Sequence, residues 1–163
     1  MTYQFSQYEI RDQIYESEAT IVFRAIRKED RLPVVLKVLK EACLTDERLE
    51  RYRREYELLR GLDIPGVVRV HDFGRYLNGY CLTLEDFGGE SLKELLKRRR
   101  SSLPEFLDIA LQTCAVLAEL HLADIIHKDV NPANLVCNLA TGKVKIIDFG
   151  ISTLLPRLNP TLK

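Results

Sequence analysis

Four segments in the first half of the chain are rich in β-branched and aromatic residues, with apolar positions that suit a partly buried β-strand. They are residues 20–26, 33–39, 67–73 and 80–84. The polar run 28–31 separates the first two, which are predicted to form an antiparallel hairpin. Asn78-Gly79 separates the last two and favours a tight hairpin turn, because both central positions of such a turn need positive φ.

Helical spacing replaces the strand pattern in two regions. Residues 45–61 repeat apolar positions every three or four residues, with Thr45 as the expected N-cap and Gly61 as the expected stop. After Gly88-Gly89, serines at 91 and 102 each stand three residues before a glutamate, the spacing of a capping box. The second serine opens a long helix, and its expected apolar face is Leu103, Phe106, Leu107, Ala110, Leu111, Cys114, Leu117 and His121.

The last part of the chain returns to strands. Residues 135–137 and 144–147 are short apolar segments on either side of a predicted turn at Thr141-Gly142. The order of elements is therefore a strand-rich part with one helix, followed by a mainly helical part.

Composition and charge narrow the possible partners and location. The chain has 24 basic and 24 acidic residues, and 46% of its residues are hydrophobic. Neither the basic excess typical of nucleic-acid binding nor an apolar stretch long enough to span a bilayer is present. The basic run 97–100 is interpreted as a solvated helix end rather than a nucleic-acid site. The four cysteines lack any C-x-x-C pair, which is typical of reduced cytosolic proteins, so a cytoplasmic location is expected.

Two motifs near the end carry candidate chemistry. The first runs from His127 to Leu135 and places Asp129 five positions before Asn134; the second is Asp-Phe-Gly at 148–150. Both motifs, in this order and with a strand pair between them, resemble the catalytic and metal-binding segments of protein kinases.

The resemblance implies ATP and Mg²⁺ as cofactors. Asp129 would orient the substrate hydroxyl, and Asn134 and Asp148 would hold the magnesium, which prefers hard oxygen ligands. His127 would lie beneath Phe149, where a core role is preferred to proton transfer.

The resemblance continues upstream. Lys37 matches the strand lysine that contacts the nucleotide phosphates, and Glu55 matches its helical partner. A solvated lysine, and a surface pair of Glu55 with Arg51, are the alternatives. Leu84 would precede a hinge at 85–87, where Glu85 and Phe87 bind adenine. The adenine ring would lie between Val22, Val35 and Leu135, although each of these could equally be plain core.

The implied fold class is α+β, a bilobal protein-kinase-like fold. Residues 1–87 would form the small β-rich lobe with its hinge, and residues 88–163 an incomplete helical lobe. No Ala-Pro-Glu motif follows Asp-Phe-Gly, so the chain is expected to be truncated. The long helix from Leu103 would then expose apolar surface, which a missing lobe or a partner would cover.

Two further departures from the family pattern concern phosphate contacts. Residues 15–22 match the glycine-rich loop but contain no glycine, so Ser17 is expected to approach phosphate less freely, and Glu16 and Glu18 add negative charge. Asn131 stands where most protein kinases have a phosphate-contacting lysine, and Lys128 replaces the usual arginine. The Asn131 variant is similar to kinase modules at the N-terminus of large bacterial hybrid sensor kinases.

These observations favour a signalling enzyme that transfers the γ-phosphoryl of Mg·ATP to a serine or threonine of an unknown protein, with weak or absent activity in this chain alone. A nucleotide-binding pseudokinase or interaction module is the main alternative. A small-molecule phosphotransferase shares the Asp-to-Asn spacing and is less favoured by Asp-Phe-Gly.

Overall fold

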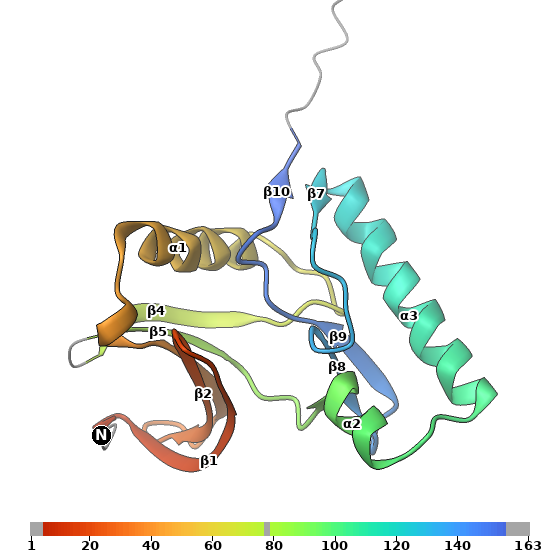
Figure 1. The fold of residues 1–163 in the computed structure, drawn as a ribbon, viewed down its shortest axis with the longest axis horizontal. Coiled ribbons are helices and arrows are strands. Elements are labelled where there is room, and N and C mark those ends of the chain that lie inside the picture. Colours follow the sequence, from red (N-terminus) through yellow and green to blue (C-terminus); the bar gives the residue numbers. More distant parts are fainter. Residues whose placement is uncertain (1–4, 77–78, 156–163) are drawn as a thin grey trace, which may run out of the picture. The chain divides into compact units, whose positions relative to one another are not determined.

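The computed structural model describes residues 5–76 and 79–155, and their fold is α+β. These residues divide into two compact units (Figure 1). Unit 1 comprises residues 1–62 and 68–88, and unit 2 comprises residues 63–67 and 89–163. The units therefore differ from the expected boundary at 87/88 in two places: Gly88 belongs to unit 1, and residues 63–67 belong to unit 2. Residues 63–67 are the larger difference. They belong to unit 2 because Gly66 accepts a hydrogen bond from the Ile146 N–H at 2.8 Å and Val67 forms a parallel bridge with Ile146.

Unit 1 is built on a five-stranded sheet in the order β1-β2-β3-β5-β4, with antiparallel neighbours throughout. The strands are β1 (Tyr8–Glu16), β2 (Thr20–Arg27), β3 (Pro33–Leu39), β4 (Val70–Tyr76) and β5 (Gly79–Glu85). The predicted hairpin of β2 and β3 is confirmed. Strand β1 was not predicted, and β4 begins three residues later than expected.

The connection between β4 and β5 differs from the expected turn. Gly79 already pairs with Tyr76, so it belongs to the ladder rather than to a central turn position. Residues 77–78, including Asn78, lie outside the described residues. A Cβ at Gly79 would lie 2.6 Å from the carbonyl oxygen of Leu39, so glycine is needed here for close backbone approach.

The sheet of unit 1 has one face devoted to an apolar core. Val34, Leu36 and Val38 alternate along β3 and are at most 3% exposed. They pack in a cluster with Phe5, Tyr8, Ile21, Phe23, Ala25 and Cys81. Because side chains alternate across a strand, Val35 and Lys37 point to the opposite face.

Helix α1 (Asp46–Arg60) follows the 3₁₀ turn η1 (Glu41–Cys43). The predicted N-cap is confirmed, since the Thr45 side chain accepts the Arg48 N–H. The helix ends as expected before Gly61, but this glycine has φ −86° and does not use the left-handed conformation typical of a glycine stop. Its buried side chains are Tyr52, Glu55 and Leu59, so an acidic residue lies within the apolar face.

Among its described residues, unit 2 contains two helices and five short strands. These are β6 (Glu90–Ser91), α2 (Leu92–Arg98), α3 (Leu103–Leu122), β7 (Ile125–Ile126), β8 (Leu135–Asn138), β9 (Lys143–Ile146) and β10 (Thr153–Leu154). Both predicted capping serines are confirmed, because Ser91 accepts the Glu94 N–H and Ser102 the Glu105 N–H. The predicted pairing of β8 with β9 is also confirmed, with Gly142 at φ 68° in the turn.

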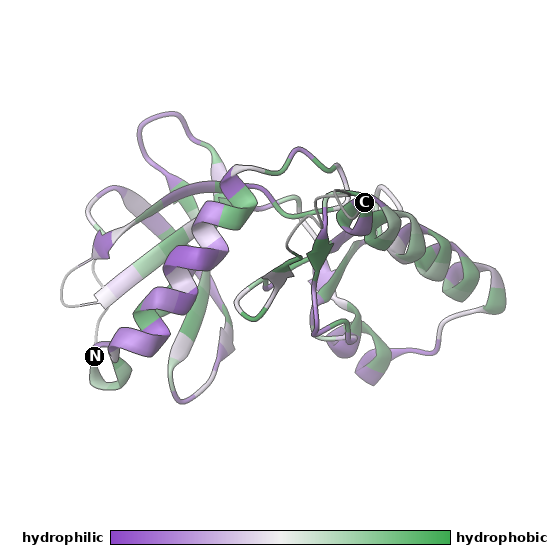
Figure 2. Ribbon diagram, turned by 90° about the horizontal axis from the view of Figure 1, so that it is seen from above, coloured by the Kyte–Doolittle hydropathy of each residue, from purple (hydrophilic) through white to green (hydrophobic). Residues whose placement is uncertain are grey.

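Helix α3 exposes much of its apolar surface, as expected, and buries only a few of its residues. Its buried residues are Thr113, Val116 and Leu120. Figure 2 shows that hydrophobic residues occupy most of the length of this helix. Several members of the predicted apolar face are exposed. They are Leu103, Phe106, Leu107 and Leu111, at 49–70% exposure. A helix that is apolar nearly all round does not reveal its packing face by periodicity. No helix within residues 5–76 and 79–155 is long and apolar enough to cross a membrane.

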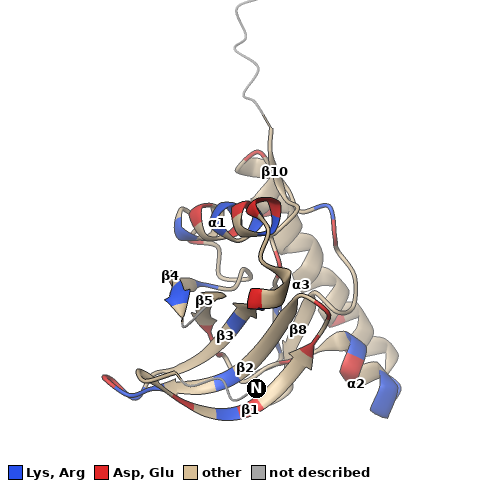
Figure 3. Cartoon of the chain, turned by 60° about the vertical axis from the view of Figure 1, so that its left-hand side comes forward, with Lys and Arg blue, Asp and Glu red and all other residues tan. Residues whose placement is uncertain are grey.

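The basic run at 97–100 lies at the C-terminal end of α2 (Figure 3). Lys97 pairs with Glu94 at 2.7 Å, Arg98 pairs with Glu90, and Arg99 pairs with Glu105. Most of its charge is therefore balanced locally, which supports its interpretation as a solvated helix end.

Candidate active site

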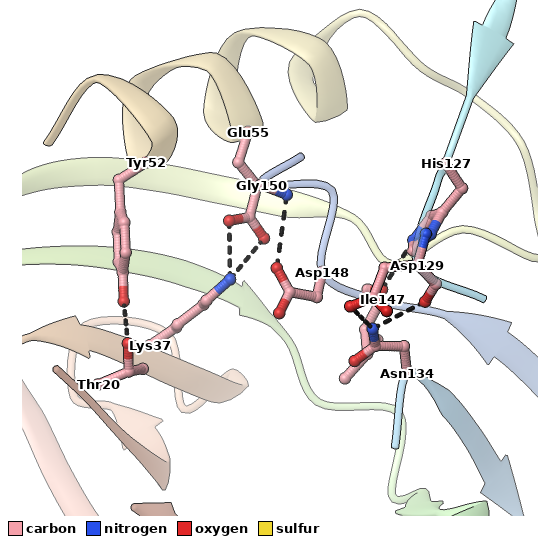
Figure 4. Close-up of polar contacts among 10 residues, drawn as sticks. All are labelled: Thr20, Lys37, Tyr52, Glu55, His127, Asp129, Asn134, Ile147, Asp148 and Gly150. Atoms are coloured by element: carbon pink, nitrogen blue, oxygen red, sulfur yellow. Dashed lines mark hydrogen bonds and ion pairs between the residues drawn. The ribbon is translucent and has the colours of Figure 1, made fainter. Parts of the chain in front are cut away.

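Unit 1 contains a buried ion pair between β3 and α1. The Lys37 ammonium lies 2.7 Å and 3.0 Å from the two carboxylate oxygens of Glu55 (Figure 4). The Lys37 side chain is 14% exposed and that of Glu55 only 2%. A carboxylate at this depth requires a charged or hydrogen-bonding partner. The alternative pairing of Glu55 with Arg51 is wrong, since Arg51 pairs with Glu47 on the surface.

Tyr52 extends this group on the same helix. Its ring centroid lies 5.3 Å from the Lys37 ammonium, within cation–π range. Its hydroxyl shares a 2.9 Å hydrogen bond with the Thr20 hydroxyl at the start of β2. The sequence pattern indicated only an apolar role for Tyr52, because helical spacing does not reveal contacts with another strand.

The β1–β2 turn, which was expected to correspond to the glycine-rich loop, is closed by local polar contacts. Ser17 donates its backbone N–H to the Thr20 carbonyl at 2.8 Å, and its hydroxyl accepts the Thr20 N–H at 3.1 Å. The Lys40 ammonium lies 2.6 Å from a Glu16 carboxylate oxygen and 2.8 Å from the Ser17 carbonyl oxygen. Hydrogen bonding from Lys40 lowers the pKa of Glu16. The charge of Glu16 is therefore balanced within the unit.

The segment expected to be the hinge follows β5 directly. Glu85 exchanges hydrogen bonds with the Arg69 backbone, donating its N–H at 3.0 Å and accepting at its carboxylate at 2.9 Å. The Asp86 N–H contacts the Pro33 carbonyl at 3.4 Å, and its carboxylate pairs with Arg24 at 3.2 Å. These contacts fix the direction in which the chain leaves β5 towards Phe87.

The three residues expected around adenine are divided between the units. Val22 pairs with Lys37 across β2 and β3, and Val35 lies two residues before Lys37, so all three share one face of the sheet. Leu84, which was expected just before the hinge, pairs with Val35 and is 6% exposed. Leu135 lies in unit 2, where it opens β8 and is 8% exposed.

Unit 2 holds the predicted catalytic loop. The side-chain amide of Asn134 donates to a carboxylate oxygen of Asp129 at 2.8 Å and to its carbonyl oxygen at 2.9 Å (Figure 4). Asn131 also donates to the Asp129 carboxylate, at 2.8 Å. Lys128, just before Asp129, has φ 69° and directs its ammonium to the Thr153 hydroxyl. A non-glycine residue at such φ is disfavoured and needs support from surrounding contacts.

Asp148 stands close to this loop within the same unit. The N–H of Ile147, the preceding residue, donates to the Asn134 carbonyl at 3.0 Å. Asp148 itself has φ 65°, and its carboxylate accepts the Gly150 N–H at 3.4 Å. The sequence motifs identified Asp129 and Asp148, but they contain no signal for the left-handed conformations of Lys128 and Asp148.

The residues present fit a magnesium ion. Asn134 directs its NH₂ group at Asp129, which leaves its side-chain oxygen as the atom able to accept or to ligate. Together with the Asp148 carboxylate this provides hard oxygen donors, which Mg²⁺ prefers. The described residues contain no cluster of three or more His, Cys, Asp or Glu suited to a metal. Magnesium typically uses only one or two protein carboxylates and completes its shell with water and phosphate.

His127 is part of the core beneath the loop. It is 1% exposed, and its ring meets Phe149 edge-on at a centroid distance of 4.6 Å. Its Nδ1 accepts the Asp129 N–H at 3.2 Å, so Nε2 carries the proton and donates to the Ile147 carbonyl at 3.0 Å. Burial lowers the pKa of His127. These contacts agree with the structural role expected for this histidine.

The neutral His127 predicts a pH-dependent stability. Because its folded pKa lies below the ordinary value of 6.5, its contribution is complete above pH 6.5. It is lost as the pH falls from there through the folded pKa, at up to about 1.4 kcal/mol per pH unit. Urea unfolding between pH 5 and 8 should therefore show a smaller acid-side loss in His127→Gln than in the wild type.

His71 provides the control for this measurement, because partial desolvation lowers its pKa as well, although its side chain is exposed. His71→Gln removes that second contribution and leaves the one from His127 in place. An acid-side slope that is the same in His127→Gln and in the wild type would contradict the prediction.

Comparisons with known proteins identify the family of this chain. The protein kinase domain family matches residues 8–161. The serine/threonine-protein kinase PknA of Mycobacterium tuberculosis is 41% identical over 126 residues, covering 73% of this chain and 29% of PknA. PrkC of Bacillus subtilis is 33% identical over 124 residues, covering 75% of this chain and 19% of PrkC. The kinase pkn3 of Myxococcus xanthus is 31% identical over 154 residues, covering 91% of this chain and 28% of pkn3.

The chain thus spans less than a third of each of these relatives. The match of the domain family nevertheless covers nearly the whole chain and includes every predicted site residue. The chain belongs to the protein kinase family, as a domain of the eukaryotic-like serine/threonine type found in bacteria.

Proposed function

We propose that this chain transfers the γ-phosphoryl group of ATP to a serine or threonine hydroxyl of a protein. The observation that carries the proposal is the Lys37–Glu55 ion pair, with a 2.7 Å contact and a carboxylate side chain 2% exposed. Taking two charges out of water is costly, so a pair kept at this depth has a role that packing alone would not require. In protein kinases this ion pair must be formed before phosphoryl transfer can occur.

Each predicted residue has a defined task in the proposed reaction. Lys37 would bind the α- and β-phosphates, held in place by Glu55. Asp129 would orient the acceptor hydroxyl and take up its proton. Asn134 and Asp148 would hold Mg²⁺, which neutralises phosphate charge when bound. Ser17 would lie near the phosphates. The residues proposed to bind adenine are Val22, Val35, Glu85, Phe87 and Leu135.

A second function is favoured by the β1–β2 turn. Glycine lets backbone N–H groups approach phosphate closely, whereas this turn contains none and is tied to Lys40 through Glu16 and Ser17. A domain that binds nucleotide weakly and acts through a protein partner would fit this feature. The cytoplasmic location, and a place within a larger signalling protein, stay predictions.

The first test is thermal unfolding of the chain with and without Mg·ATP. At 100 times its dissociation constant, a ligand should stabilise the folded protein by about 2.7 kcal/mol, a shift of several degrees. Asp148→Asn should abolish the magnesium-dependent part of this shift. Asp12→Asn, which changes an exposed carboxylate on β1, should preserve it.

Transfer of ³²P from ATP to a generic protein substrate then separates the two functions. Transfer that depends on Lys37 supports the kinase. A nucleotide-dependent shift without any transfer supports the non-catalytic domain, and the absence of both contradicts nucleotide binding itself.

A further inference from the structure

Asn131 makes contacts that differ from those expected of a phosphate-binding lysine. Its side-chain NH₂ donates to a carboxylate oxygen of Asp129, Oδ1, at 2.8 Å, and lies 3.3 Å from the Asp129 carbonyl oxygen. Its side-chain oxygen accepts the Ala133 N–H at 2.8 Å. The side chain is therefore directed back into its own loop, and its donor end meets the carboxylate of Asp129.

Asn134 holds the other oxygen of the same carboxylate. Its side-chain NH₂ donates to Oδ2 of Asp129 at 2.8 Å. Asp129 is thus held at both oxygens by separate amides, which fixes the plane of its carboxylate. Each carboxylate oxygen can accept about two hydrogen bonds, so a substrate hydroxyl could still be accepted beside the amides.

We infer that Asn131 is a positioning residue for Asp129, an inference that rests on the proposed kinase function. An amide donor replaces the cation that most protein kinases place at this position. Its effect on the reaction would act through the orientation of Asp129, which would take the hydroxyl proton, and not through the phosphates. Loss of this contact should therefore lower kcat and leave the KM for ATP unchanged.

Asn131 also shapes the loop, and this second role needs its own control. Besides accepting the Ala133 N–H, it accepts the Asn134 N–H at its backbone carbonyl at 3.0 Å. Serine and aspartate keep a side-chain acceptor for such a turn, but neither an ionised aspartate nor the shorter serine can reproduce the amide donor to Asp129. Alanine removes both side-chain interactions, the donor to Asp129 and the acceptor for the Ala133 N–H.

Steady-state kinetics of Asn131→Ser, Asn131→Asp and Asn131→Ala distinguish the two roles. A positioning role predicts that kcat falls about ten-fold or more in all three, because a hydrogen bond to a charged group is lost. Aspartate should be the most severe, since it places a second negative charge against Asp129. Wild-type kcat in the serine and aspartate variants would show that Asn131 only shapes the turn, and would overturn the inference.

A measurement without turnover keeps this inference separate from the proposed function. In ¹⁵N-labelled protein, the side-chain NH₂ signals of Asn131 are identified by their absence in Asn131→Ser. They should shift in Asp129→Ala and stay in place in Asp12→Asn, which alters an exposed carboxylate on β1. If the wild type shows no phosphoryl transfer, the proposed function fails while such a shift still supports the contact. Unchanged Asn131 signals in Asp129→Ala would overturn the inference.

Discussion

Lys37→Met is expected to lower the free energy of unfolding by about 3–5 kcal/mol, because it leaves the Glu55 carboxylate buried without its cation. The Glu55 side chain is 2% exposed, and both of its oxygens lie within 3.0 Å of the Lys37 ammonium. Urea unfolding followed by circular dichroism at neutral pH measures the change.

The double variant Lys37→Met/Glu55→Leu separates stability from function. Replacing both members of a buried pair by apolar residues is often neutral or stabilising, so most of the lost stability should return. Phosphoryl transfer should stay absent, because the double variant provides no cation for the phosphates. A double variant that is as unstable as Lys37→Met would contradict this account of the pair.

A surface pair on the same helix is the matched control. Arg51 and Glu47 are 2.7 Å apart at the i and i+4 positions, with side chains 53% and 76% exposed. Arg51→Met should change the free energy of unfolding by less than about 1 kcal/mol, because exposed ion pairs contribute little. If Arg51→Met lost as much free energy of unfolding as Lys37→Met, burial of the ion pair would not explain the destabilisation caused by removing its cation.

Local sequence signals predicted the elements whose hydrogen bonds form between residues close to one another along the chain. The β2–β3 hairpin, the caps at Thr45, Ser91 and Ser102, and the β8–β9 pair all formed as expected. Each depends on contacts within a few residues along the chain, or on a short turn. Such contacts are encoded in the order of the residues and do not need the rest of the fold.

Elements that depend on distant partners were less accessible to sequence reasoning. Strand β1 is mostly exposed and carries charged residues, so it lacks the apolar pattern of a strand with a buried face. Helix α3 is apolar on several sides, and its buried face is fixed by contacts such as that of Val116 with Gly66. A Cβ at Gly66 would lie 1.9 Å from a methyl group of Val116. No pattern within α3 indicates this packing.

The candidate site shows the same division. The identities of Lys37, Glu55, Asp129, Asn134 and Asp148 came from motifs. Their hydrogen bonds did not, because an aspartate-to-asparagine spacing does not say which oxygen an amide will contact. The motif reading treated Asn131 as the loss of a cation, whereas the structure shows a donor to Asp129.

Asp129→Asn is expected to reduce kcat by about 10²- to 10⁴-fold, the range typical of a lost general base. The asparagine cannot take up the hydroxyl proton at neutral pH. In the wild type, Asn131 and Asn134 each donate to one carboxylate oxygen of Asp129. The asparagine replaces one of these oxygens with an NH₂ group, so one of the two amide donors meets another donor instead of an acceptor. This mismatch should cost about 1–3 kcal/mol of stability, which urea unfolding can measure separately.

Binding of Mg·ATP shows whether the fall in kcat in Asp129→Asn comes from the lost proton acceptor or from loss of nucleotide binding. Because Lys37 and Asp148 are unchanged, Asp129→Asn should keep the thermal shift produced by Mg·ATP, whereas Asp148→Asn should lose its magnesium-dependent part. Asp108→Asn, which alters a carboxylate that accepts from Gln112 on the exposed part of α3, should keep both binding and turnover. Wild-type turnover in Asp129→Asn would mean that another group takes the hydroxyl proton. The carboxylate held by the two asparagines would then only maintain the shape of the loop.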